Sequence, residues 1–122
     1  MEEFLVEFYE KCDGSHPAED FIRSLDKKMM ARMYGIIGIL EEKGNLLREP
    51  YSKHIEDGIF EIRAKFGSDI SRVLYFFYIG RRIILTNGFI KKTQKTPITE
   101  IALAKKYRKD FISRMEGQNE NL

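Results

Sequence analysis

Two kinds of side chain in this sequence could act on phosphates: cations, which neutralise phosphate oxygens, and histidine, which exchanges protons near neutral pH. They gather beside polar residues at Lys53, His54, Arg63, Lys65, Arg72, Lys91, Lys92 and Lys95. A histidine such as His54 could take the proton of an RNA 2′-hydroxyl or return one to the departing 5′-oxygen. This set predicts metal-free cleavage of RNA, with the 2′-hydroxyl as nucleophile and a cyclic phosphate as product.

Each candidate also has a structural interpretation. His54 fits a surface loop, and Arg63 shares a predicted strand face with Glu61, which fits a structural ion pair. Arg72 begins an apolar strand after a loop, where we expect the cation to be more exposed to ligand than to the core. The Lys91-Lys92 pair is either a solvated pair or part of a site at a loop mouth.

Motifs for other common chemistries are missing. The sequence has no phosphate-binding glycine loop, no dinucleotide fingerprint, no Gly-x-Ser-x-Gly and no His-Glu-x-x-His. Cys12 is the only cysteine, which excludes a disulfide within the chain and a zinc site built on several cysteines. We therefore expect neither a metal nor a cofactor.

Length and composition predict one globular domain. The chain has 122 residues, 43% of them hydrophobic, and we place the domain at residues 1–116 with a frayed tail at 117–122. The longest apolar run, residues 73–79, is too short to span a bilayer. The N-terminus is acidic where a signal peptide would be basic. These features predict a cytoplasmic protein that does not enter a membrane.

The charges divide unevenly along the chain. Residues 1–62 hold 8 Lys+Arg against 14 Asp+Glu, whereas residues 81–114 hold 10 against 2. A locally positive surface attracts polyanions even when the net charge is only +2. Nucleic acid or another polyanion is therefore the expected partner, although basic helices can also be solvated faces.

Hydrophobic periodicity predicts an α+β fold. The expected elements, in chain order, are a strand at 4–9, helical structure at 16–43, strands at 58–66, 72–79 and 82–86, and a helix that follows Thr96-Pro97. Asp26 is a candidate N-cap, so residues 16–43 form one helix or two. Gly35 and Gly38 inside this stretch suggest close packing on another element. The short connections favour antiparallel hairpins.

Several segments carry a resemblance to a known family. They are residues 47–63 (LREPYSKHIEDGIFEIR), 72–76 (RVLYF) and 84–97 (ILTNGFIKKTQKTP), followed by Glu100-Ile101-Ala102 and Tyr107-Arg108. Together they resemble the phage-derived branch of the RelE/HigB toxin superfamily. The resemblance implies a RelE-like small twisted antiparallel sheet flanked by helices. It also implies the toxin of a type II toxin–antitoxin pair, which cleaves mRNA, often on the ribosome, and is neutralised by a helix-turn-helix antitoxin protein.

The resemblance implies roles for individual residues. Arg72 matches the arginine that stabilises the scissile phosphate, Lys91 and Lys92 match the basic pair after the last strand, and His54 matches the histidine that acts as acid or base. Arg63 matches a family arginine, and with Lys53, Lys65 and Lys95 it is expected to bind RNA. The chain departs from the RelE branch at two places. It has Ile59 and Glu61 where that branch has lysines, and it has Thr93, Gln94 and Lys95 where that branch has a tyrosine or histidine.

Two functions from different classes therefore stay open. One is an RNA-cleaving toxin, and the other is a basic module without catalysis that binds nucleic acid or an acidic protein.

Overall fold

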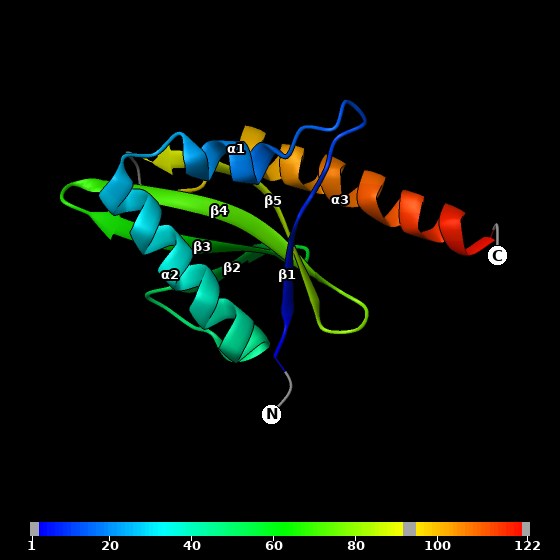
Figure 1. Cartoon of the computed structure of the whole chain (residues 1–122), viewed down its shortest axis with the longest axis horizontal. Helices are drawn as coiled ribbons and strands as arrows, with labels where there is room; N and C mark the ends of the chain where they lie inside the picture. Colours follow the sequence, from blue (N-terminus) through cyan, green and yellow to red (C-terminus); the bar gives the residue numbers. More distant parts are fainter. Residues whose placement is uncertain (1–2, 92–94, 121–122) are drawn as a thin grey trace.

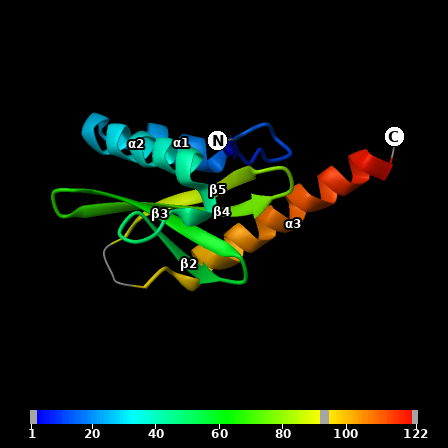
Figure 2. The same cartoon turned by 90° about the horizontal axis from the view of Figure 1, so that it is seen from below.

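The computed structural model describes residues 3–91 and 95–120, and it is an α+β fold with one five-stranded sheet. The elements are β1 (Leu5–Phe8), α1 (Pro17–Arg23), α2 (Lys27–Lys43), the 3₁₀ turn η1 (Gly44–Leu46), β2 (Ser52–Glu56), β3 (Ile59–Phe66), β4 (Asp69–Tyr78), β5 (Arg82–Lys91) and α3 (Ile98–Glu120). The helices α1 and α2 cover one face of the sheet, and α3 crosses the other (Figures 1 and 2). The α+β class predicted from the sequence is confirmed.

The strand order is β1-β5-β4-β3-β2. The three hairpins from β2 to β5 are antiparallel, as their short connections predict. The first strand instead pairs with β5 in parallel, with Leu5 opposite Arg82, and α1, α2 and the strands β2 to β4 lie between the two strands in the sequence. The sheet is therefore mixed, with one parallel pair at its edge.

The helical stretch divides at Asp26 into two helices, which was one of the two arrangements expected for residues 16–43. The Asp26 side chain accepts a hydrogen bond from the Met29 amide at 3.0 Å and so caps α2. The second helix ends at Gly44, whose φ of 53° suits a residue without a side chain. At the other end of the chain α3 continues to Glu120, past residue 116, where the sequence analysis placed the end of the domain.

A strand that the sequence analysis did not predict, β2, carries Lys53 and His54. It forms a hairpin with β3 through Asp57 and Gly58, whose φ angles of 50° and 74° are both positive, as a type I′ turn requires. His54 therefore lies on a strand, and its placement in a loop was wrong.

Two apolar clusters fill the two sides of the sheet. One lies under α1 and α2 and includes Ile62, Val73 and Leu85, and the other lies under α3 and includes Leu74 and Ile84. Because side chains alternate along a strand, neighbouring residues such as Val73 and Leu74 belong to different clusters. Face assignments for the charged residues follow from the same alternation.

Close packing at glycines occurs elsewhere than expected. A Cβ at Gly35 or Gly38 would meet no atom within 4 Å, so close packing does not explain these two glycines. A Cβ at Gly88 would overlap the Phe21 ring and lie 3.0 Å from the Arg72 carbonyl oxygen. The close approach between helix and sheet is therefore between α1 and β5.

Within the described ranges, no helix combines the length and the hydropathy needed to cross a lipid bilayer.

Candidate functional site

A buried carboxylate, Glu61, organises the charged end of the α3 face of the sheet. It is 0% exposed and accepts hydrogen bonds from Arg72 Nη1, from Arg63 Nε at 2.9 Å and from Thr96 Oγ1 at 2.7 Å. Arg63 and Arg72 face each other in the register of β3 and β4, and Thr96 lies just before α3. We call these four residues the Glu61 cluster. It confirms the ion pair between Arg63 and Glu61 that the strand alternation predicted.

The electrostatics of the cluster favour an ionised Glu61. Burial alone would raise the pKa of its carboxyl, but the hydrogen bonds from Thr96 and Arg63 and the charge of Arg72 outweigh burial and lower that pKa below its usual value. Two guanidinium groups then share one carboxylate, which leaves one positive charge in excess. The Nε of Arg72 is buried and makes no hydrogen bond with the described residues.

Arg72 is not exposed as expected. Only 4% of the residue is accessible, because it is the fourth residue of β4 rather than the first and lies between β3 and β5. Of the two arginines, Arg63 is nearer to solvent, with 22% of its side chain accessible. A ligand phosphate would therefore meet Arg63 before Arg72.

Three of the predicted lysines lie around the Glu61 cluster. Lys53 faces Glu61 in the register of β2 and β3, Lys65 follows Arg63 by two residues on the same strand face, and Lys95 precedes Thr96. All three are exposed. The structure thus brings five of the eight predicted residues together, namely Lys53, Arg63, Lys65, Arg72 and Lys95.

One of the other three predicted residues, His54, is not part of this group. His54 pairs with Phe60 in the register, and its ring packs edge-on against Phe60 at 4.9 Å between centroids. Phe60 belongs to the α1/α2 side of the sheet, so His54 and Arg72 lie on opposite faces. Lys91, at the end of β5, is opposite Ile70 of β4, and Ile70 is in turn opposite Lys65 of β3, so Lys91 and Lys65 belong to one row across the sheet. Lys92 lies outside the described residues.

His54 is held by its own hairpin. Its Nε2 accepts a hydrogen bond from the Gly58 amide at 3.2 Å, and the side chain is otherwise exposed. This contact stabilises the turn that ends β2. The histidine has a structural function here, whatever else it does.

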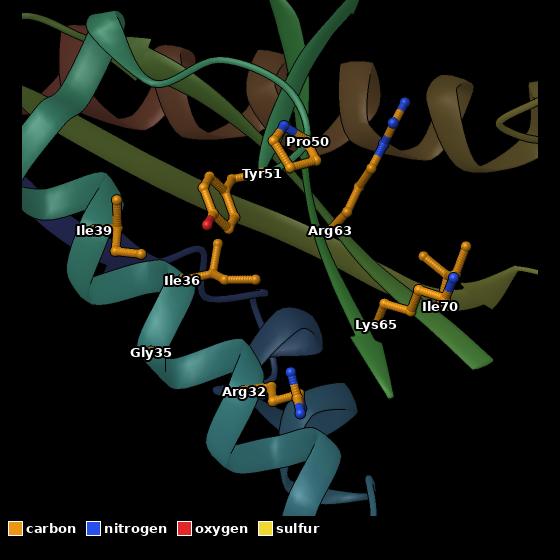
Figure 3. A pocket seen from close by; sticks show the side chains of 9 residues that line it. All are labelled: Arg32, Gly35, Ile36, Ile39, Pro50, Tyr51, Arg63, Lys65 and Ile70. Atoms are coloured by element: carbon orange, nitrogen blue, oxygen red, sulfur yellow. The ribbon is translucent and has the colours of Figure 1, made fainter. Parts of the chain in front are cut away.

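A groove runs beside the Glu61 cluster, between α2 and the edge of β3 (Figure 3). Its volume is about 590 Å³, and its lining residues are Arg32, Gly35, Ile36, Ile39, Pro50, Tyr51, Arg63, Lys65 and Ile70. Arg32 and Tyr51 were not among the site residues predicted from the sequence. The Asp57-Gly58 turn was the available signal, because the hairpin it predicts places residues 50 and 51 at the edge of β3.

The arrangement favours binding of an anion over binding of a metal. Exposed lysines and the partly exposed Arg63 can hold phosphate oxygens, and a lysine could also transfer a proton. No cluster of three or more His, Cys, Asp or Glu residues suited to a metal ion occurs within residues 3–91 and 95–120. The site is therefore a cationic surface organised around one buried carboxylate.

Comparison with known proteins identifies the family of this chain. The family described as Phage derived protein Gp49-like (DUF891) matches residues 20–109, which include α2, all strands from β2 to β5 and the whole Glu61 cluster. A search of curated proteins gave no match to this chain. Because the match spans most of the sequence, the chain belongs to the phage-derived Gp49-like family.

Proposed function

We propose that this protein is the toxin of a type II toxin–antitoxin pair and that it cleaves mRNA without a metal, through the 2′-hydroxyl. The observation that carries the proposal is the gathering of Lys53, Arg63, Lys65 and Lys95 around the Glu61 cluster on one face of the sheet. Cations in this arrangement bind the RNA backbone and stabilise charge that develops at phosphorus. The resemblance to RelE/HigB toxins supports the same function, with a helix-turn-helix antitoxin as partner and cleavage on the ribosome.

The proposed roles follow the geometry. Arg63 and the exposed lysines bind phosphates, and Arg72 holds Glu61 and so positions Arg63. Proton transfer is assigned to a lysine, either Lys65 or one of the Lys91-Lys92 pair. His54 is the weaker candidate because it lies across the sheet from Arg72.

The alternative is a basic module that binds RNA without cleaving it. Two observations favour this alternative: Glu61 already occupies both guanidinium groups, and the histidine is on the other face. Such a module would show salt-sensitive RNA binding and no cleavage product.

Induction in bacteria, with growth followed and the 5′ ends of cellular mRNA mapped, distinguishes these functions. The test variant is Lys53→Ala/Lys65→Ala, which removes two exposed charges and leaves the Glu61 cluster intact. Its matched control is Lys43→Ala/Lys109→Ala, which removes two exposed lysines elsewhere. We expect wild type and control to arrest growth and produce new ends inside translated regions, and the test variant to lose at least tenfold in cleavage.

Other results would change the assignment. Equal cleavage by the test variant and the control would place the active site elsewhere. A His54→Ala protein that no longer cleaves would return proton transfer to the histidine. Normal growth and unchanged ends, with good expression and salt-sensitive RNA binding, would establish the binding module instead.

A further inference from the structure

The groove between α2 and β3 combines an apolar floor with cations at its rim. Ile36, Ile39 and Ile70 are buried or partly buried, and Tyr51 is 44% exposed. Figure 3 shows the Tyr51 ring beside Pro50 and opposite α2. The lining includes three cations and no acidic residue. An exposed aromatic ring among cations is the pattern of a surface that binds single-stranded nucleic acid.

A second aromatic side chain lies near the same rim. Phe66, at the end of β3, has Arg32 5.3 Å and Lys28 5.6 Å from its ring centroid. These cations are thereby held on the α2 side of the groove, and both are exposed. The positive rim thus extends from Lys65 to the first turns of α2.

Two local features keep the groove open. The ladder between β2 and β3 ends at Ile62, and the Arg63 amide still donates a hydrogen bond to the Tyr51 carbonyl oxygen at 2.9 Å, so residues 64–66 of β3 have no strand beside them on this edge. On the opposite wall, Gly35 has no side chain, and a Cβ there would meet nothing within 4 Å. A residue as large as leucine at this position would therefore enter the groove rather than the protein core.

The groove also connects with the Glu61 cluster through Arg63. The stem of Arg63 lines the groove, while its guanidinium points away from the floor (Figure 3) and donates to Glu61 on the α3 face. An RNA strand that contacts Lys53 and Lys65 can therefore pass around the free edge of β3 into the groove. The two surfaces form one continuous cationic path.

We propose that this groove is a nucleotide subsite, which holds an unpaired base of the RNA strand against Tyr51 and its flanking phosphates at Arg32 and Lys65. The proposal rests on the proposed function, because it gives the RNA bound at the Glu61 cluster a second point of contact. The volume of the groove, about 590 Å³, is in the range of small-molecule sites. Stacking on one tyrosine accepts any base, so the subsite adds affinity with little sequence preference.

The test uses the purified full chain and a fluorescent 2′-O-methyl RNA of about 12 nucleotides, which lacks the nucleophile and is not cleaved. Gly35→Leu fills the groove, and Gly38→Leu is the matched control: same helix, same substitution, also open to solvent, but outside the groove lining. We expect Gly35→Leu to weaken binding about tenfold and Gly38→Leu to leave it unchanged. Tyr51→Ala provides a second variant and should weaken binding by a similar factor.

The outcomes separate this proposal from the proposed function. If wild type cleaves mRNA in cells and binds the RNA probe, but Gly35→Leu binds it equally well, the subsite is overturned and the toxin function stands. If wild type does not bind the RNA probe, the subsite is overturned, and the mapping of mRNA ends in cells decides the toxin function separately. A peptide rich in glutamate and leucine is the competing probe: if Gly35→Leu loses this peptide and keeps the RNA, the groove binds an acidic protein and the RNA subsite is overturned.

Discussion

The two faces of the sheet bury different kinds of side chain. Under α1 and α2 the inward residues, such as Ile62 and Val73, are apolar. Under α3 the apolar set, with Leu74, covers only part of the face, and the same strands then bury Glu61 and Arg72. A buried charge is tolerated only when it is paired and hydrogen-bonded. The α1/α2 face is therefore specified by packing, and the charged end of the α3 face by electrostatic pairing.

The largest effect should follow from removing one partner of the buried pair. Arg72→Ala leaves Glu61 without its buried guanidinium, so we expect a loss of about 3–5 kcal/mol in the free energy of unfolding. Urea denaturation followed by circular dichroism measures it. The double variant Glu61→Leu/Arg72→Met removes both charges and should recover more than half of the loss, since apolar replacement of a whole pair is often close to neutral. A loss below about 1 kcal/mol in Arg72→Ala would mean that solvent reaches Glu61.

A smaller loss of stability should follow from adding a methyl group on the α1/α2 face of the sheet. In Gly88→Ala the new Cβ overlaps the Phe21 ring beside the Arg72 carbonyl, so α1 must shift, and we expect a loss of about 1–3 kcal/mol. Gly35→Ala is the matched control: its Cβ meets open space, and the higher helix propensity of alanine should stabilise the protein by about 1 kcal/mol. Equal effects in the two variants would show that neither glycine is there for packing.

The sequence predicted the elements better than it predicted the faces. The periodicity of residues 16–43, with a cap at Asp26, predicts α2 because both signals are local. The missing strand β2 was also predictable from the Asp57-Gly58 turn, which is a strong hairpin signal. The side of the sheet on which His54 lies was not, because it depends on register, and a shift of one residue moves a side chain to the other face.

The candidate site was predictable only in part for the same reason. Alternation along β3 is enough to pair Arg63 with Glu61, two residues away. The contact between Glu61 and Arg72 joins two strands, and the one between Glu61 and Thr96 spans 35 positions in the sequence. Such contacts exist only after the sheet and the start of α3 are assembled. Sequence reasoning therefore identified the cations and the pair of Arg63 with Glu61, but not that the same carboxylate also binds Arg72 and Thr96.

The smallest of the three effects should appear on acidification. Protonation of Glu61 removes a charge on the α3 face and leaves the packing of both faces unchanged. Since the pKa of Glu61 is lowered in the folded state, the folded protein binds fewer protons there than the unfolded chain. The stability from this carboxylate is thus complete above its usual pKa of about 4.5 and is lost as the pH falls through the lower, folded value. The comparison is wild type against Glu61→Gln, with urea midpoints measured from pH 7 to pH 3. Asp110, whose pKa is also lowered, titrates equally in both proteins, so their difference reports Glu61 alone. The difference should shrink as the pH falls; a constant difference would mean that the carboxylate contributes through its shape and hydrogen bonds rather than its charge.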